Sequence, residues 1–220
     1  MKGFTWAGDL NGHKNPVVKK YYVPDATAIE RGEPVDFTQG TGVIVLAGPT
    51  DLDDPILGVS MNEKAASDGQ TLLEVSASPT AIYKFNGMNK TYTLTGGSTT
   101  TAVDSSLVPQ TDNFFIGGSI KIVSCAADSS LNGRVVSISD STGATGTLTL
   151  AETLPAALAA GDTINICLGY MAENYLGYDL TADAMAPDFD AVGGNVLRFL
   201  YSTPETLDMY FVFERHAAVS

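Results

Sequence analysis

The chain has 220 residues, of which 44% are hydrophobic and only 17% are charged, and its formal net charge is −13. A chain of this length can bury a sizeable core without disulfides or metals, and its hydrophobic content excludes wholesale disorder. The excess of acidic groups repels phosphate backbones and argues against direct nucleic-acid binding, and no stretch approaches the roughly 20 apolar residues of a membrane helix.

Short runs of β-branched and aromatic residues, separated by glycine, proline and aspartate, dominate the first half of the chain, and such runs predict strands. These predicted strands lie at residues 16–23, 42–47, 56–61, 71–76 and 81–85. Between the first two, residues 28–37 carry a turn signal at Arg31-Gly32, and Pro34 indicates an edge strand or the start of a strand. One helical turn is expected at residues 63–67, and Asp68-Gly69 predicts a tight turn. Residues 1–15 have little periodicity and are predicted to form an extended N-terminal arm.

The same pattern continues after residue 90, in a stretch rich in threonine, serine and glycine. It predicts strands at residues 119–124, 133–139, 146–150 and 163–168, and a hairpin formed by residues 196–201 and 207–214. An alanine-rich stretch at 154–160 is expected to hold a short helix. Residues 170–194 are predicted to be an irregular, acidic surface segment.

Regular short strands with turn signals between them are typical of barrels and sandwiches. We therefore predict an all-β protein with two small β-barrel or sandwich modules and an extended N-terminal arm. The predicted divisions are the arm at 1–15, a β-barrel module at 16–88, a second barrel or sandwich module at 89–168, and an acidic loop segment with a C-terminal β-hairpin at 169–220.

The sequence offers no catalytic motif. Its two histidines, His13 and His216, lie near the two ends of the sequence, where the rigidity that a nucleophile–histidine–acid triad needs is hard to achieve. Neither a GxSxG nucleophile motif nor a phosphate-binding glycine motif occurs. We therefore predict that the protein is not an enzyme and needs no cofactor.

Few residues are candidates for metal binding or covalent cross-linking. Asp51, Asp53 and Asp54 share a short loop, but this loop lacks the glycine and the distal glutamate of an EF-hand, so we interpret it as solvated and keep it only as a weak cation candidate. Cys125 and Cys167 lie in separate apolar runs. They predict two buried thiols, with a disulfide as the alternative.

Most aromatic residues fall on predicted strands, where we expect them to pack in cores and across strands. Phe4 and Trp6 differ, because the predicted arm has no local core for them to join. They either fold back onto their own domain or anchor in another chain as interface residues do, and we favour the second alternative. The candidate contact residues are Phe4, Trp6 and His13 in the arm, and Tyr175, Tyr178 and Phe189 in the acidic segment.

The stretch from Val17 to Phe85 carries a rhythm of turn residues and aliphatic residues. This rhythm runs through residues 28–35 (AIERGEPV), 42–46 (GVIVL), 56–59 (ILGV) and 63–75 (EKAASDGQTLLEV). In it, Gly32 turns a hairpin and Gly58 allows close packing of strands. The stretch, about a third of the chain, resembles the small β-barrel capsid decoration (cement) proteins of tailed bacteriophages.

The resemblance implies a virion protein that is added to the outside of an assembled head. Members of this family commonly form homotrimers and clamp neighbouring capsomers, so the expected partners are the major capsid protein and further copies of the chain, with no nucleic acid and no membrane. The first residues show no apolar signal segment, so we expect synthesis in the host cytoplasm. We also expect deletion of residues 1–15 to weaken capsid attachment and to leave the fold intact.

Two alternatives remain open at this point. One is a tail or fibre component that binds a host surface through its β modules. The other is a carbohydrate-binding or hydrolytic module.

Overall fold

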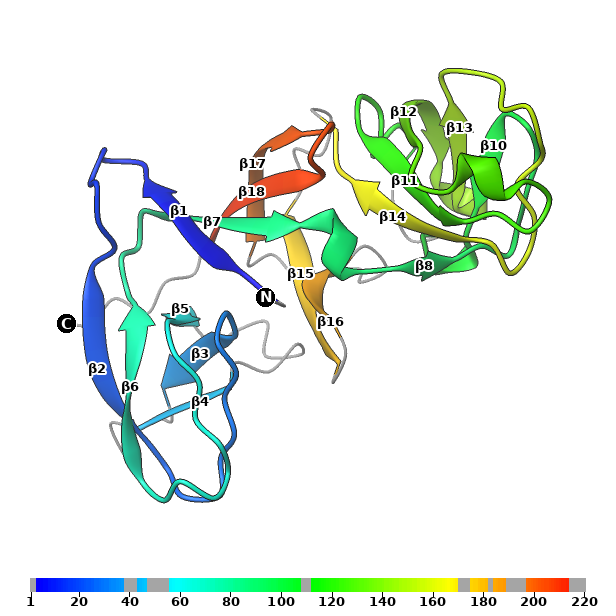
Figure 1. Cartoon of the computed structure of the whole chain (residues 1–220). Coiled ribbons are helices and arrows are strands. Elements are labelled where there is room, and N and C mark those ends of the chain that lie inside the picture. The colour runs from blue at the N-terminus through cyan, green and yellow to red at the C-terminus, as the bar shows by residue number, and fades with distance from the viewer. Residues whose placement is uncertain are drawn as a thin grey trace.

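The computed structural model describes residues 3–37, 43–46, 56–107, 112–169, 175–181, 184–188 and 197–213. Within these residues the chain is built from short strands, and its helices are three-residue 3-10 turns. The strands form a curled five-stranded sheet and a curled seven-stranded sheet at opposite ends of a central six-stranded sheet (Figure 1). The prediction of an all-β protein with barrel or sandwich modules is confirmed.

The first curled sheet, the five-stranded half-barrel, follows the order β2-β6-β5-β3-β4. Its strands are β2 (Val18–Val23), β3 (Pro34–Phe37), β4 (Ile44–Leu46), β5 (Ile56–Ser60) and β6 (Thr71–Ser76). An isolated parallel bridge between Tyr22 and Val43 brings the β4 end of this sheet against β2. Alternate residues of a strand point to opposite faces, so Val23, Leu73 and Val75 fill the interior of the curl.

The helical turn expected at residues 63–67 is not formed. The backbone N–H of Ile29 donates to the carbonyl of Lys64 at 2.9 Å, and the N–H of Lys64 donates to the carbonyl of Ile29 at 2.8 Å. This pairing with the segment before β3 takes the place of local helical hydrogen bonds. The tight turn at Asp68-Gly69 is confirmed, with Gly69 at a φ of 67°, a conformation that glycine adopts without a Cβ penalty.

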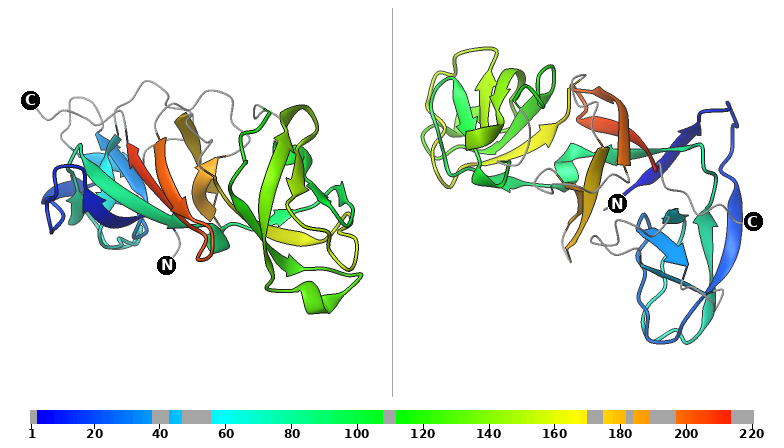
Figure 2. Two further views of the ribbon diagram at one scale, coloured as in Figure 1. Left: turned by 90° about the horizontal axis from the view of Figure 1, so that it is seen from above. Right: turned by 180° about the vertical axis from the view of Figure 1, so that it is seen from behind.

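The central sheet combines three distant parts of the chain. Its strands, in sheet order, are β1 (Thr5–Asp9), β7 (Ala81–Asn86), β18 (Asp208–Phe213), β17 (Leu197–Thr203), β15 (Tyr175–Thr181) and β16 (Ala184–Asp188). β1 and β18 pair antiparallel with β7 on its two sides. The predicted C-terminal hairpin is confirmed as β17–β18, and it adds to β7, the strand that leaves the half-barrel (Figure 2).

The central sheet changes the predicted divisions of the chain. Residues 1–15, expected as an arm, contribute β1, and residues 170–194, expected as irregular, contribute the antiparallel hairpin β15–β16. β7 lies in the central sheet, although the sequence assigned it to the barrel module at 16–88. The strand forms there because its alternate residues Tyr83 and Phe85 pack in the large core to which Phe4 also belongs.

The second curled sheet, the seven-stranded half-barrel, follows the order β8-β14-β11-β12-β13-β10-β9. Its strands are β8 (Tyr92–Thr93), β9 (Gly96–Gly97), β10 (Thr101–Val103), β11 (Ser119–Ser124), β12 (Val135–Thr142), β13 (Thr147–Leu150) and β14 (Thr163–Cys167). The 3-10 turns are η1 (Gly87–Asn89), η2 (Ser105–Leu107), η3 (Ser129–Leu131) and η4 (Gly143–Thr145). The two end strands, β8 and β9, are neighbours in the chain, so the sheet curls back toward its own start.

The short helix expected at residues 154–160 is not formed either. The N–H of Leu154 donates to the carbonyl of Thr99 at 2.7 Å, and the N–H of Leu158 donates to the carbonyl of Ser98 at 3.0 Å. Both leucine side chains are buried in the core. The segment is therefore held against the loop between β9 and β10. These contacts override the helical preference of its alanines.

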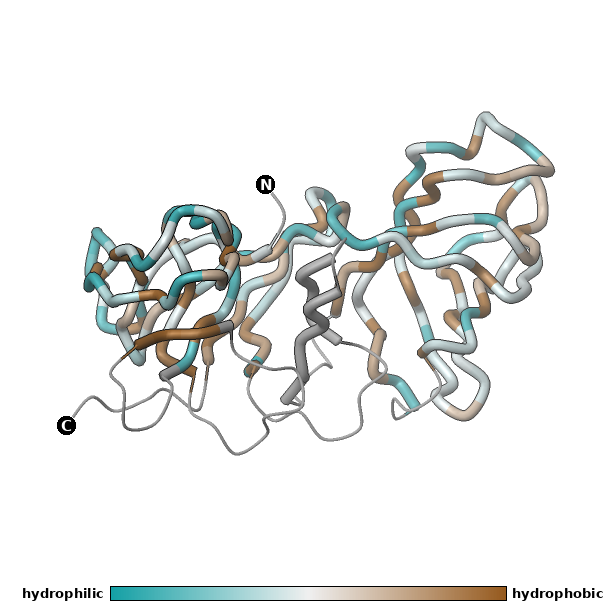
Figure 3. Tube along the Cα trace, turned by 90° about the horizontal axis from the view of Figure 1, so that it is seen from below, coloured by the Kyte–Doolittle hydropathy of each residue, from teal (hydrophilic) through white to brown (hydrophobic). Residues whose placement is uncertain are grey.

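In the part of the chain that the structure describes, the buried hydrophobic side chains form two clusters. One fills the five-stranded half-barrel, and the other runs from the central sheet into the seven-stranded half-barrel. Hydropathy varies from residue to residue along both half-barrels, as a strand with one buried face requires (Figure 3). The hydroxyl of Ser202 donates to the carbonyl of Leu168 at 2.6 Å, and that of Ser119 donates to the carbonyl of Pro204 at 3.1 Å. The C-terminal hairpin and the seven-stranded half-barrel therefore pack as one unit.

Cys125 and Cys167 are both free and buried, which confirms the prediction of two buried thiols and excludes the disulfide. Burial raises the pKa of the Cys167 thiol to about 12. A hydrogen bond with Ser202 lowers this pKa, and the nearby carboxylates of Asp208 and Glu205 raise it. Burial also raises the pKa of the Tyr83 phenol, although hydrogen bonding to Ser76 acts in the opposite direction.

These two groups predict a loss of stability in alkali. Each pKa is higher in the folded chain than in the unfolded chain, so the stabilisation is fully present below the unfolded value and is lost as the pH rises through the folded one. For Cys167 this window runs from the ordinary 9.0 to about 12. Urea unfolding followed by circular dichroism should give a free energy of unfolding that falls steadily above pH ~9, and falls less steeply in Cys167→Ala. Stability that stays constant through this window contradicts the assignment.

Candidate functional site

Phe4 belongs to the core of its own chain. Its side chain is 2% exposed, and its ring centroid lies 5.8 Å from that of Phe85, 6.1 Å from that of Phe211 and 5.5 Å from that of Phe213. The prediction that Phe4 anchors in another chain is therefore wrong. The aromatic residues of β7 and β18 supply the core that the first residues lack locally, and the sequence pattern did not reveal this long-range partner.

Trp6 lies at the edge of the same core. Its side chain is partly buried and packs against the cluster that contains Phe4. Its indole Nε1 atom is buried and has no hydrogen-bond partner among the residues that the structure describes. Phe4 and Trp6 both line one cavity, but only Trp6 is partly exposed, so of the two it is the one that keeps a surface open to a partner.

His13 is exposed in the loop between β1 and β2. Asp9 fixes the start of this loop: its carboxylate accepts hydrogen bonds from the hydroxyls of Ser78 and Thr80 and from the backbone N–H of Asn11. Burial opposes ionisation of Asp9, but these hydrogen bonds and the nearby His13 hold its pKa below the ordinary value.

The other predicted contact residues lie in the acidic segment. Tyr175 and Tyr178 are both in β15, where Tyr175 pairs with Arg198 of β17 and Tyr178 pairs with Pro187 of β16. Phe189 lies outside the described residues. So do the weak cation candidates Asp51, Asp53 and Asp54. Among the residues that are described, no group of three or more histidine, cysteine, aspartate or glutamate side chains is placed to hold a metal ion.

A cavity of about 260 Å³ lies between β1, the loops before β2 and β3, and the end of β5. It is lined by Phe4, Thr5, Trp6, Pro16, Arg31, Val59, Ser60 and Met61. Four separate stretches of the sequence meet here, which is why no sequence motif marks the site. Arg31 is the only charged residue among the lining residues that the structure describes, and it is exposed.

Ser60 fixes the loop that carries Arg31. Its hydroxyl accepts hydrogen bonds from the backbone N–H groups of Gly32, at 3.0 Å, and Glu33, at 3.1 Å, and donates to the carbonyl of Glu30 at 2.5 Å. The backbone N–H of Phe4 donates to the carbonyl of Gly32 at 3.1 Å. The loop is thus held from β5 on one side and from the start of β1 on the other.

The outer face of β2 and β6 carries exposed apolar side chains. Tyr22 is 54% exposed, Leu72 is 45% exposed, and the two residues are paired directly across the strands. Val18 lies on the same face of β2 and is 41% exposed. Between them, Lys20 and Glu74 form a surface ion pair at 3.3 Å. We call Val18, Tyr22 and Leu72 the outer apolar face.

The sequence did not distinguish the two adjacent tyrosines of β2. Tyr21 packs partly buried against the interior of the half-barrel, whereas Tyr22 points outward. Both were expected to pack in the core or across strands. The two-residue period of a strand separates them. Val23 is buried, so Tyr21, two residues earlier, faces the same interior and Tyr22 faces outward.

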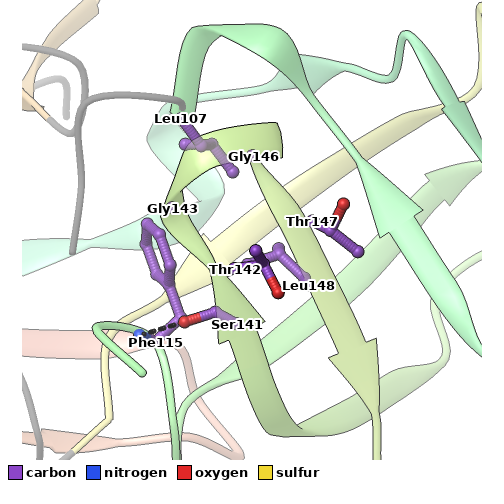
Figure 4. A pocket seen from close by; sticks show the side chains of 8 residues that line it. All are labelled: Leu107, Phe115, Ser141, Thr142, Gly143, Gly146, Thr147 and Leu148. Atoms are coloured by element: carbon purple, nitrogen blue, oxygen red, sulfur yellow. Dashed lines mark hydrogen bonds between the residues drawn. The ribbon is translucent and has the colours of Figure 1, made fainter. Parts of the chain in front are cut away.

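A second hollow lies in the seven-stranded half-barrel, beside the turn that carries Gly146 (Figure 4). The backbone N–H of Phe115 donates to the hydroxyl of Ser141 at 3.1 Å at its edge. The hollow leaves no room for a water molecule. It is therefore part of the packed interior and not a ligand site.

No family model matches this chain, and neither a curated protein nor a solved structure is significantly similar to it. In the part of the chain that the structure describes, no helix is long and apolar enough to cross a membrane.

Proposed function

We propose that the chain is a structural protein of a tailed-phage virion that binds the outside of the assembled head and clamps neighbouring capsomers. The observation that carries this proposal is the outer apolar face. Tyr22 and Leu72 form a contiguous exposed pair on a module whose interior is already filled, and such surfaces commonly mark sites of protein contact. The face belongs to the same stretch, Val17 to Phe85, that resembles decoration proteins.

The arrangement of the modules also supports the proposal. The two half-barrels lie at opposite ends of the central sheet, so the molecule is elongated (Figures 1 and 2). An elongated protein can reach two neighbouring subunits at once. The net charge of −13 suits a position on the outside of the shell, away from the packaged nucleic acid.

The mechanism would be stabilisation by mass action. A protein that binds the assembled shell and not the free subunits shifts the equilibrium toward assembly in proportion to the logarithm of its concentration. The proposed partners are the major capsid protein and further copies of the chain in a homotrimer, with a location on the capsid exterior.

Antibody labelling of intact virions, viewed by negative-stain electron microscopy, tests this proposal. The proposal predicts label spread over the head. Label confined to the tail or fibres would assign the chain to host attachment instead. Virions without label, together with turnover of a glycan or ester by the purified chain, would favour the carbohydrate-binding or hydrolytic alternative.

The outer apolar face makes a specific prediction. The double variant Tyr22→Ser, Leu72→Ser should bind purified heads at least about tenfold more weakly, which corresponds to about 1.4 kcal/mol, because both side chains would otherwise be removed from water at the contact. Binding is measured by cosedimentation over a range of chain concentrations. Val123→Ser alters an exposed valine of the seven-stranded half-barrel and serves as the control. Equal binding by the double variant and the unaltered chain would remove this face from the contact.

A further inference from the structure

The cavity beside Trp6 has the properties of a receptor for one side chain of a partner. We propose that it receives an apolar side chain of an extended peptide segment, and that a carboxylate next to that side chain pairs with Arg31. The inference deepens the proposed function. It rests on that function only for the premise that the partner is a protein.

The walls of the cavity fit an apolar group. Phe4, Trp6, Pro16, Val59 and Met61 provide most of the lining. Its volume of about 260 Å³ is below the range of about 300–1,000 Å³ that is usual for drug-sized ligands and cofactors. A single leucine-sized or aromatic side chain matches this size better than a cofactor does.

The cavity is also preorganised, because its walls are fixed by contacts within the chain. Phe4 and Val59 are buried in the large core, and Ser60 holds the Arg31 loop through its three hydrogen bonds. A site that needs no rearrangement loses less free energy to ordering when a ligand binds.

Arg31 gives the site its charge preference. Among the described residues, Arg31 is the only ionisable side chain in the lining, and its guanidinium makes no ion pair or hydrogen bond with any of these residues. In a chain with a net charge of −13, a cation that has no ion pair among the described residues and lies beside an apolar cavity selects a carboxylate and disfavours an ammonium group. The guanidinium can hold a carboxylate through two parallel hydrogen bonds.

The position of the cavity favours a peptide over a free organic acid. β1, which supplies Thr5 and Trp6 to the lining, is the end strand of the central sheet in the described part of the chain. An extended segment that places a side chain in the cavity would run alongside this strand. Addition of a peptide along a strand, with pockets for its side chains, is a common mode of peptide recognition.

Trp6 is the only tryptophan in the chain and lines the cavity, so its fluorescence reports directly on occupancy. The full chain is titrated with the acetylated and amidated dipeptide leucyl-aspartate and with its neutral counterpart leucyl-asparagine. We expect a saturable change in Trp6 emission and about tenfold tighter binding of the acidic peptide. Arg31→Gln should abolish this preference. Lys19→Gln, which removes an exposed cation from β2, should preserve it.

The experiment has clear contrary outcomes. No saturable change with either peptide, equal affinity for both peptides, or an acidic preference that survives in Arg31→Gln overturns the proposal. Hexanoate binding as tightly as leucyl-aspartate would make the ligand a free acid and overturn the peptide assignment. An unchanged urea midpoint of Arg31→Gln shows that a lost preference is not a loss of fold. These titrations contain no phage heads, so they test the cavity separately from the proposed function. If the chain binds the peptide but does not bind heads, the proposed function is refuted and the inference about the cavity is not.

Discussion

Gly58→Ala is expected to lower the free energy of unfolding of the five-stranded half-barrel by about 3 kcal/mol, because its new methyl group has no space. A Cβ atom at this position would lie 1.9 Å from the carbonyl oxygen of Ser76 and 3.0 Å from Cγ1 of Val75. The oxygen belongs to the backbone of β6, which is paired with β2 on one side and β5 on the other. The clash therefore cannot be relieved by rotating a side chain, and the pairing of β5 with β6 must open.

The matched control is Gly8→Ala in β1, where the nearest atom to the new Cβ is Cδ1 of Ile82 at 3.8 Å, an ordinary contact. This variant should change the free energy of unfolding by no more than about 0.5 kcal/mol. Urea denaturation followed by circular dichroism measures both variants. If Gly58→Ala were as stable as Gly8→Ala, the close approach of β5 to β6 would be wrong.

Phe4→Ala should cost about 4 kcal/mol of stability, within the usual range for removing a buried phenylalanine ring. The ring lies among Phe85, Phe211 and Phe213, so its removal leaves a cavity where the two ends of the chain meet. Leu10→Ala removes a side chain that is 51% exposed at the end of the same segment and should cost no more than about 0.5 kcal/mol. The urea midpoint of each variant separates these outcomes.

The position of Phe4 reverses one expectation from the sequence. Deleting residues 1–15 was expected to leave the fold intact, but the deletion removes β1 and the Phe4 ring together. The structure predicts a destabilised or unfolded product. A deletion variant with the stability of the full chain would show that the N-terminal segment is an arm after all.

Much of the fold could be predicted from local patterns. The strands β5, β6, β11 and β14 begin at the expected residues, because alternating β-branched and aromatic residues between glycine and aspartate leave few alternatives. The close approach at Gly58 was likewise visible in its sequence context. Local patterns failed where distant contacts decide the conformation: at 154–160 the backbone bonds to a loop and not to itself, and at 63–67 it pairs with Ile29.

The candidate site was harder to predict than the fold. A sequence pattern locates residues on a strand, but it does not show which distant strand will cover them. Phe4 was assigned to an interface because its partners on β18 lie about 200 residues away in the sequence. The cavity was missed for the same reason, since Trp6, Pro16, Arg31 and Met61 come together only when the central sheet meets the half-barrel.

The most direct test of the central claim is the stability of assembled heads. Heads that lack the chain are heated or exposed to denaturant with increasing concentrations of the purified protein, and the loss of intact shells is followed by light scattering. The account predicts that the disruption midpoint rises with the logarithm of the chain concentration, because the chain binds the shell and not the free subunits. A midpoint that does not change while the chain is present in excess would contradict it.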